Sequence, residues 1–425
     1  MIKTKITKLI FGGQGLGRIN GQAAMIWNAL PGEEVAVTIT KNKRSYCEGI
    51  STQIINPCAD RITPRDRHFA ACSPWQIMKP ETENYWKLEI GREIYQRFAG
   101  IKVAPDLKII ASDECFHNYR HKMEFVFTEN DRGQLSFAHS KRDSHQTEPL
   151  TECSLLSKAA SRTAQAILDW LRQQKIPRRE LKSLLVRSNQ KGETIAALFV
   201  KKPRDFISFP ALKDHWLGFY IFYSSPLSPA NLISREIGHS GQDYLEEIIF
   251  SKKFRYGLSS FFQINPPLFQ SAITDAAKFI QAQDKLVDFY AGVGSIGLSL
   301  QTANQPLALI ESFPEAIAYA KQNIALNHSV NSRTITGAAE NALDYITPDS
   351  TVIFDPPRAG LHPKIIKKIL ASEPAKIFYL SCNPATHARD LKMLLTRYRL
   401  DFLRLYNFFP RTPHIEGLAI LTRNK

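Results

Sequence analysis

Cysteine is scarce in this chain, which has six cysteines among 425 residues. That number is too small for a disulfide scaffold, so we expect free or chemically used thiols in a reducing compartment. No apolar run approaches the ~18 residues that a membrane span needs, and the first residues lack the apolar core of a signal peptide. We therefore expect a cytoplasmic protein with no membrane partner.

Acidic residues are in deficit, because 40 Asp and Glu stand against 55 Lys and Arg, which gives a net charge of +15. Such an excess favours a polyanionic partner, most often a nucleic acid, although a basic enzyme that makes no specific use of its charge is the alternative. The hydrophobic share of 44% excludes wholesale disorder. At roughly 150 residues per domain, the length indicates about three domains.

Residues 1–58 are predicted to form a small β-barrel. Short strands at 26–27 and 34–39 are separated by glycine-rich turns, with no helical period between them. The densest basic cluster of this module, residues 41–46, combines Lys, Arg and Tyr. Such a surface can follow phosphates and stack bases, so we expect an RNA-binding module. The alternative is a solvated basic loop.

Residues 59–255 are predicted to form a central α+β domain. Helical periodicity covers 154–174, and strand patterns occur at 183–187, 194–200 and 216–223.

Residues 256–425 alternate short apolar runs with helical patterns. The runs at 285–290, 307–311, 351–355 and 376–381 are predicted to be buried parallel strands. Helical patterns at 294–301, 315–327 and 363–371 stand between them. This order is typical of the α/β class, with a Rossmann-like doubly wound sheet whose chemistry lies at the carboxyl ends of the strands.

A glycine-rich turn follows the first of these strands. Gly292, Gly294 and Gly297 satisfy G-x-G-x-x-G, and Glu311 follows at about the spacing of a ribose-binding acid. A nicotinamide-dependent oxidoreductase is therefore one interpretation. Asp288, which ends the strand before the turn, favours S-adenosylmethionine as the ligand instead, and the later motifs have no use in hydride transfer.

Three reactive side chains lie at the ends of later strands: two follow a strand, and the third precedes the final strand at 418–421. Asp355 precedes two prolines that hold it on a rigid turn, and Cys382 follows the strand at 376–381. Glu416 stands between Ile415 and Gly417, where partial burial would raise its pKa and suit it to act as a general base. Alone, Cys382 could be an inert buried thiol and Glu416 a surface residue.

Together these groups suit methyl transfer to C5 of uracil, a carbon too weakly nucleophilic to attack a methyl sulfonium by itself. Addition of a thiolate to C6 makes C5 enolate-like, after which C5 takes the methyl group and a base removes its proton. The target uridine must leave any stack to be approached above its plane.

Over essentially its whole length the chain resembles the bacterial RNA uracil-C5 methyltransferases that carry an N-terminal TRAM domain. The motifs that carry this resemblance are residues 12–18, 30–33, 46, 260–265, 288–294, 355–360, 381–384 and 414–416. The resemblance implies Cys382 as nucleophile and Glu416 as proton acceptor. It also implies four contacts to S-adenosylmethionine, which are Gln263, Tyr290, Glu311 and Asp355.

The TRAM module favours large-subunit ribosomal RNA as substrate, because tRNA-specific relatives usually lack it; transfer RNA is the alternative. A catalytically silent RNA-binding protein is a further alternative, against which the intact pair of Cys382 and Glu416 argues. No obligate protein partner is implied.

Many members of the family that this chain resembles hold a four-iron cluster through four cysteines. Here Cys72 and Cys153 match the second and fourth ligands, whereas Asp66 and Trp75 stand at the first and third. Two thiolates of four are not expected to hold such a cluster, so we predict no iron–sulfur cluster and no metal. Two further cysteines, Cys58 and Cys115, lie off the motif.

Overall fold

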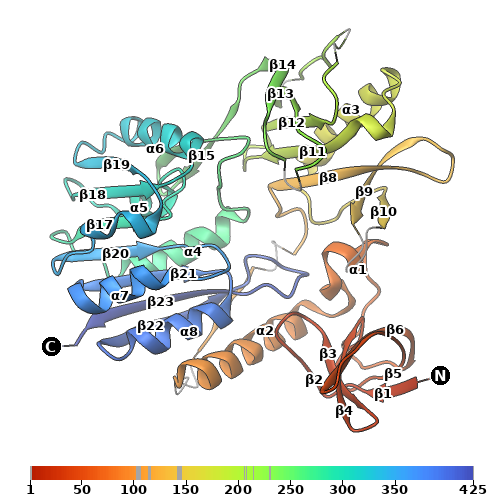
Figure 1. The fold of residues 1–425 in the computed structure, drawn as a ribbon, viewed down its shortest axis with the longest axis horizontal. Coiled ribbons are helices and arrows are strands. Elements are labelled where there is room, and N and C mark those ends of the chain that lie inside the picture. The colour runs from red at the N-terminus through yellow and green to blue at the C-terminus, as the bar shows by residue number, and fades with distance from the viewer. Residues whose placement is uncertain are drawn as a thin grey trace.

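The computed structural model of the chain describes residues 2–101, 107–112, 116–140, 146–204, 206, 208–213, 215–228 and 231–424, so Cys115 lies outside the described residues. A barrel-like sheet, a seven-stranded sheet and an eight-stranded sheet with helices on both faces follow one another (Figure 1). Among the described helices, none is long and apolar enough to cross a membrane.

The N-terminal sheet has the strand order β1-β5-β6-β4-β3-β2. Its strands are β1 Ile2–Lys5, β2 Lys8–Leu9, β3 Gly15–Ile19, β4 Gln22–Trp27, β5 Glu34–Asn42 and β6 Tyr46–Asn56. The Thr4 hydroxyl donates to the carbonyl oxygen of Arg18 at 2.9 Å and accepts from its N–H at 3.1 Å, so β1 and β3 are held together. Gly17 permits this approach, because a Cβ there would lie 2.5 Å from Oγ1 of Thr4. The sheet therefore curls into the expected small barrel.

The middle sheet has the strand order β10-β9-β8-β11-β12-β13-β14. Its strands are β8 Lys122–Glu129, β9 Leu135–Ser140, β10 Thr147–Leu150, β11 Leu181–Ser188, β12 Thr194–Val200, β13 Trp216–Tyr223 and β14 Arg235–Gly241. Helix α3, Lys158–Gln173, packs on one face, and Ser157 caps its start by accepting a hydrogen bond from Ala160 N–H. The predicted helix and the three predicted strands β11, β12 and β13 are thus confirmed.

The C-terminal sheet has the strand order β19-β18-β17-β20-β21-β23-β22-β7. Its strands are β7 Ile109–Ile110, β17 Lys285–Phe289, β18 Leu307–Glu311, β19 Ser332–Thr336, β20 Ser350–Phe354, β21 Lys376–Ser381, β22 Tyr398–Tyr406 and β23 Glu416–Arg423. The four strands predicted from apolar runs are β17, β18, β20 and β21, and they pair in parallel. A small hairpin of β15 Tyr244–Ile249 and β16 Lys252–Gly257 precedes this sheet.

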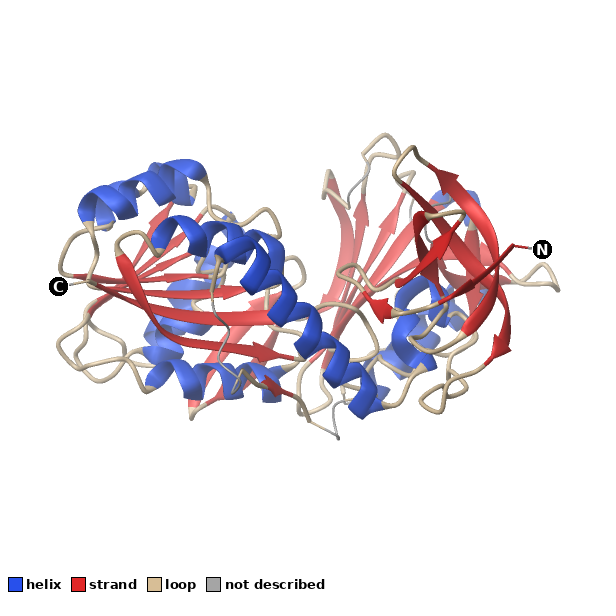
Figure 2. Cartoon of the chain, turned by 90° about the horizontal axis from the view of Figure 1, so that it is seen from below, coloured by secondary structure: helices blue, strands red, loops and turns tan. Residues whose placement is uncertain are grey.

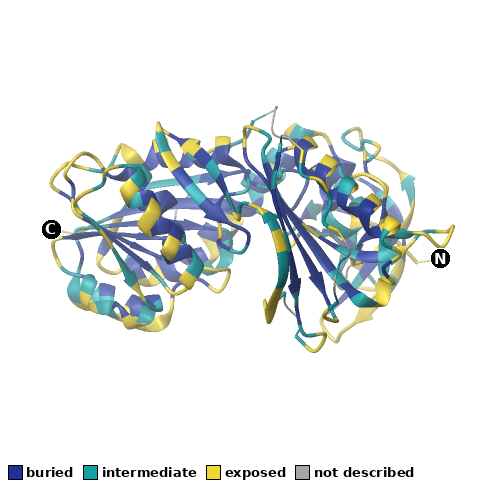
Figure 3. Ribbon diagram, turned by 90° about the horizontal axis from the view of Figure 1, so that it is seen from above, coloured by how far each residue is buried: buried dark blue, intermediate teal, exposed yellow. Residues whose placement is uncertain are grey.

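Helices cover both faces of the eight-stranded sheet (Figure 2). One face carries α4 Pro266–Ala277, α5 Ser295–Leu300 and α6 Pro314–Leu326; the other carries α2 Pro80–Ile94, α7 Pro363–Ser372 and α8 Pro384–Leu394. Consecutive strand residues enter opposite cores, as Leu286 and Val287 do. The strands are therefore buried on both faces, as Figure 3 shows, which confirms the doubly wound arrangement.

The segment between the barrel and the middle sheet joins all three parts. The short helices α1 Phe69–Cys72 and η1 Pro74–Ile77 lead into α2, which packs against α8 of the C-terminal sheet. Trp75 of η1 is buried, and its Nε1 donates to the carbonyl oxygen of Gly13 at 2.9 Å. The barrel is thus fixed to the linker rather than tethered loosely.

Candidate active site

The strand register brings the predicted catalytic residues to one edge of the sheet. Ser381 at the end of β21 pairs with Gly417 near the start of the antiparallel β23. Cys382 and Glu416 are the next residues beyond this pair, and the charge of Glu416 raises the pKa of the Cys382 thiol, so the two side chains lie near each other. A nucleophile from the end of one strand and a carboxylate from the start of its neighbour are juxtaposed by backbone pairing.

The same edge receives two of the predicted cofactor contacts. Phe289, Phe354 and Tyr379 are in register across the parallel strands β17, β20 and β21. Tyr290 and Asp355 follow the first two of these residues directly, so both lie at the carboxyl ends of neighbouring strands.

Burial dominates the electrostatics of the Cys382 and Glu416 pair. Burial raises the pKa of the Cys382 thiol to about 12, with further increases from Glu416 and Asp355, whereas Arg358 lowers it. Glu416 is only 5% exposed, and burial raises its pKa well above the ordinary value; Asp355 adds to this increase and Arg358 opposes it. The four side chains therefore form one electrostatic unit in which Arg358 is the stabilising cation for both reactive groups.

Asp355 is held by the side chain of another predicted cofactor contact. Gln263 Nε2 donates to Asp355 Oδ2 at 3.1 Å, and burial raises the pKa of Asp355 to about 7. A cation placed beside this carboxyl would favour its ionised form. S-adenosylmethionine carries such a cation at its sulfonium, so the environment of Asp355 fits that ligand.

Tyr290 and Glu311 line a cleft of about 960 Å³. The lining residues do not include Gln263 or Asp355, so the described residues place the four predicted contacts in two groups. Pro357, which also lines the cleft, stands two residues after Asp355, so the two groups adjoin. A largely apolar cleft of this size with a few acidic groups suits an adenosine derivative.

The glycine-rich turn shapes the wall beside this cleft. Gly292 and Gly294 have φ angles of +56° and +86°, in the left-handed region that glycine adopts without strain. Glu311 Oε2 accepts a hydrogen bond from Gly292 N–H at 2.9 Å, so the acid at the end of β18 is fixed against the turn. Asp288 Oδ2 accepts from Gly297 N–H at 2.8 Å, and burial raises the pKa of Asp288 to about 8.

A buried polar network positions the segment that leads to Glu416, and sequence reasoning missed it. Glu83 and Lys87 of α2 form an ion pair of 2.9 Å with no exposure of either side chain. Lys87 Nζ donates to Oδ1 of Asn407, and Glu83 accepts from the N–H of Arg411. Glu83 and Lys87 stand four residues apart on a helix, a spacing that normally indicates an exposed pair, so the sequence signal was misleading.

The positions expected for a degenerate iron–sulfur site do not all converge. Trp75 turns to Gly13 of the barrel, as described above. Asp66 accepts hydrogen bonds from the N–H and hydroxyl of Ser154, the neighbour of Cys153. The residues present do not fit a four-thiolate cluster, because an indole and a carboxylate replace two of its ligands.

Comparison with known proteins agrees with this geometry. Residues 87–424 match the model of the family described as tRNA (uracil-5-)-methyltransferase, and residues 3–51 match the TRAM domain. The chain belongs to the tRNA (uracil-5-)-methyltransferase family. It is therefore an S-adenosylmethionine-dependent RNA methyltransferase with an N-terminal TRAM domain, which disfavours the nicotinamide alternative.

The similarity to known proteins covers 97–100% of this chain. A protein of Fusobacterium nucleatum described as an uncharacterized RNA methyltransferase is 27% identical over 450 residues, covering 100% of this chain and 96% of the relative. One of Nitratidesulfovibrio vulgaris with the same description is 26% identical and covers 97% of this chain and 94% of the relative. The tRNA (uracil-54, C5)-methyltransferase of Pyrococcus abyssi, solved with S-adenosyl-L-homocysteine, shares the fold with a TM-score of 0.80 at 21% identity, over 99% of this chain and 100% of that one.

Proposed function

We propose that this protein transfers the methyl group of S-adenosylmethionine to C5 of a uridine in RNA through a covalent adduct between Cys382 and C6. The observation that supports the proposal is the pairing of Ser381 with Gly417 between β21 and β23, since Cys382 and Glu416 are the next residues beyond it. Gln263, Tyr290, Glu311 and Asp355 are the proposed cofactor contacts, because they lie at the same edge or in the adjoining cleft.

The steps balance once the Cys382 thiol has lost its proton to solvent water. The Cys382 thiolate bonds to C6, and the electron pair of the C5–C6 double bond moves so that C5 becomes nucleophilic. C5 takes the methyl group as the methyl–sulfur bond of the donor breaks, which leaves S-adenosylhomocysteine. Glu416 then accepts the C5 proton, the C5–C6 double bond re-forms, and the bond between Cys382 and C6 breaks.

Because both reactive groups are buried, we expect entry of the substrate to control when the Cys382 thiolate forms. The Cys382 thiol is protonated at neutral pH because its pKa is raised to about 12. The charge of Arg358 lowers that pKa and favours the thiolate when the uracil ring arrives. The raised pKa of Glu416 makes its carboxylate a stronger proton acceptor in the later step.

Large-subunit ribosomal RNA is the proposed substrate and transfer RNA the second candidate. The barrel carries an exposed basic cluster at residues 41–44, which suits a long polyanion with contacts beyond the target nucleotide. The archaeal tRNA enzyme shares the fold over 99% of this chain, barrel included, and this favours the second candidate.

The test is methyl transfer to RNA fractions from cells that lack the gene. We expect the purified protein with S-adenosylmethionine to form 5-methyluridine in the large-subunit ribosomal fraction, mapped by mass spectrometry of nuclease fragments. Labelling of the tRNA fraction alone would overturn the ribosomal assignment but leave the chemistry intact. Methylation at another atom would overturn the chemistry itself.

Two variants assign the nucleophile. Cys382→Ala should lose methylation while it still binds S-adenosylmethionine, since Cys382 is not one of the four proposed cofactor contacts. Cys58→Ser is the matched control, because it removes another partly buried thiol. Near-normal turnover of Cys382→Ala would exclude the adduct.

A further inference from the structure

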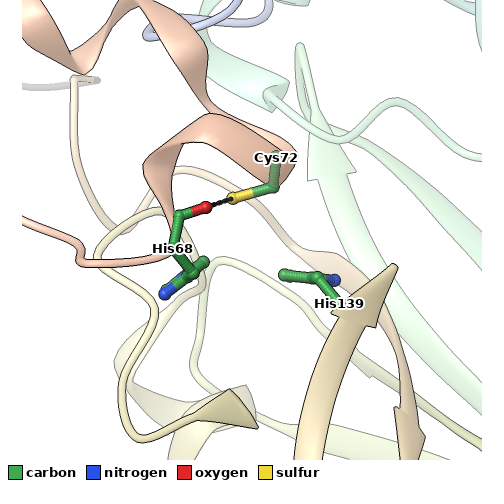
Figure 4. Close-up of side chains that lie close together, drawn as sticks. All are labelled: His68, Cys72 and His139. Atoms are coloured by element: carbon green, nitrogen blue, oxygen red, sulfur yellow. Dashed lines mark hydrogen bonds between the residues drawn. The ribbon is translucent and has the colours of Figure 1, made fainter. Parts of the chain in front are cut away.

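Three potential metal ligands gather between α1 and β9, outside the active site. His68 is the N-cap of α1, Cys72 is its last residue, and His139 lies in β9 (Figure 4). One ligand atom of each of the three side chains lies within 4.8 Å of the other two. His68 and His139 lie far apart in the sequence, so the fold, rather than local sequence, brings them together.

A second group shares His68 and extends the cluster. Asp66, His68 and Cys153 also have ligand atoms within 4.8 Å of one another. Asp66 already accepts hydrogen bonds from the N–H and hydroxyl of Ser154 and from Gln76 Nε2 at 2.7 Å. Asp66 is therefore a fixed negative charge beside the cluster, whereas Cys153 is a candidate fourth ligand.

The two histidines have buried ring nitrogens without a hydrogen bond among the described residues, although Nε2 of His68 lies 4.0 Å from Oδ2 of Asp66. Nε2 of His68 and Nε2 of His139 each have no hydrogen-bond partner among the described residues, and the His68 residue is only 3% exposed. Buried polar atoms are normally satisfied, so two orphaned nitrogens in one cluster point to a missing ligand. Imidazole nitrogens are the commonest protein ligands of zinc-like metal ions.

We propose that His68, Cys72 and His139 bind one zinc ion, with Cys153 as the fourth ligand. Imidazole and thiolate are the ligands of structural tetrahedral zinc sites, whereas a four-iron cluster requires thiolates that this chain lacks. Donor atoms bonded to zinc at about 2.0–2.3 Å stand roughly 3.4–3.8 Å apart, so a closure of about 1 Å brings His68, Cys72 and His139 to binding distance. Cys153 lies within 4.8 Å of His68 and has to move toward the other two ligands to complete the site. The site lies near the position expected for the family's cluster but uses two histidines that are not part of that motif.

The consequence of the bound ion is structural and does not rest on the proposed function. The ion joins α1 to the middle sheet through His139 and to the segment at Cys153. Since α1 leads directly into Trp75, which is bonded to Gly13 of the barrel, the ion fixes the barrel relative to the middle sheet. A metal at this point thus organises the RNA-binding part of the molecule without contact with the reacting atoms.

The test is metal analysis of the full chain purified with and without added zinc. We expect one zinc per chain, little iron and no acid-labile sulfide, together with a rise in the thermal unfolding midpoint when zinc is returned to metal-free protein. Cobalt in place of zinc should give the visible absorption of a tetrahedral site and a sulfur-to-cobalt charge-transfer band. Stoichiometric iron with sulfide, or neither metal uptake nor stabilisation, would overturn the proposal.

Variants locate the ion. His139→Ala should lower zinc affinity by about tenfold or more, since losing a ligand costs at least as much as losing an outer partner. Cys72→Ser should weaken the sulfur-to-cobalt band and, if it folds, identifies the thiolate independently of affinity. Cys58→Ser removes a thiol outside the cluster and should change neither. Zinc binding that is unchanged in both His139→Ala and Cys72→Ser would overturn the assignment.

Discussion

Nζ of Lys87 lies 2.9 Å from Oε1 of Glu83, and neither side chain has any exposure to solvent. Lys87 Nζ also donates to the carbonyl oxygen of Phe409 at 3.1 Å, and both oxygens of Glu83 accept from the N–H of Arg411 at 3.0 Å. The pair therefore fastens the segment that runs into Glu416 to helix α2. A buried ion pair of this kind gives geometry rather than net stability.

Lys87→Met should be strongly destabilising, because it leaves the buried Glu83 carboxylate with only the more distant guanidinium of Arg411, at 3.8 Å, as its cation. We expect a loss of about 3–5 kcal/mol in the free energy of unfolding, measured by denaturant titration. Since the segment before Glu416 loses its hydrogen bonds to Lys87, kcat for methylation should fall more than the KM for S-adenosylmethionine rises.

The matched control is Lys8→Met, which removes the partner of Glu93 on the same helix. Those side chains are 36% and 45% exposed, so the change should cost less than about 1 kcal/mol. Equal effects of the two substitutions would contradict the positioning role of Lys87.

The doubly wound sheet could be predicted because its strands are short, apolar and buried on both faces. The run at 307–311, for example, can bury its side chains only between two layers, and it forms β18. By contrast β19, Ser332–Thr336, is an edge strand with mixed burial and polar residues, and its sequence gave no strand signal.

The candidate site could be predicted only in part, because its members are joined by long-range contacts. The reactive residue types and their places at strand ends were evident from the sequence. The pairing of Ser381 with Gly417 was not, because β23 runs antiparallel to a sheet that otherwise suggested parallel pairing. Likewise no local pattern marks His68 and His139 as neighbours, although their rings lie 5.6 Å apart.

Glu416→Gln should trap the covalent adduct. The amide keeps the shape of the side chain but cannot accept the C5 proton, so methyl transfer occurs and release of Cys382 stalls. We expect a denaturant-resistant protein–RNA species that carries the transferred methyl group, detected by gel electrophoresis and mass spectrometry. The double variant Cys382→Ala/Glu416→Gln should form none, and absence of the species in the single variant would indicate a different base.

Cys382 should react slowly with iodoacetamide at neutral pH. Its pKa is raised to about 12, and only the thiolate is alkylated, so the rate should rise about tenfold per pH unit without a plateau below about pH 10. Mass spectrometry of the peptide that contains Cys382 separates this reaction from that of other thiols. Arg358→Ala removes the charge that lowers this pKa and should slow alkylation at every pH, whereas Arg358→Lys should largely preserve it. A plateau near neutral pH would contradict the raised pKa.

Asp288→Asn should flatten the pH dependence of stability. Burial raises the pKa of Asp288 to about 8, whereas the pKa of an aspartate in the unfolded state is about 3.9. Between these two pH values, the folded state therefore holds a proton that the unfolded state has lost. Stability from this group is therefore complete below the unfolded pKa and is lost as pH rises through the folded pKa, at up to about 1.4 kcal/mol per pH unit. Asparagine keeps an acceptor for Gly297 N–H and has no proton to lose.

The control for that measurement is Asp349→Asn. Asp349 is 71% exposed, and the Thr347 hydroxyl and Lys285 lower its pKa, so the substitution should leave the slope between about pH 5 and 8 unchanged. Denaturant titrations across this range check both variants. A slope in Asp288→Asn that equals that of the unsubstituted protein would contradict the buried neutral form of Asp288.

Substitution of the exposed barrel loop should weaken RNA binding in a salt-dependent manner. Lys43 and Arg44 are exposed at the tip between β5 and β6, and each phosphate contact contributes about 0.7–0.9 to the slope of log affinity against log salt. The double change to Ala should therefore reduce that slope by about 1–2 while S-adenosylmethionine affinity stays the same. Deletion of residues 1–58 is a poorer test, because it would also remove the hydrogen bond between Trp75 and Gly13.

Lys285→Ala is the control, since Lys285 lies at the amino end of β17, opposite the catalytic edge, where it pairs with Asp349. An unchanged slope in the loop variant, measured by filter binding over a range of salt concentrations, would show that these cations are merely solvated and that another surface of the protein holds the RNA.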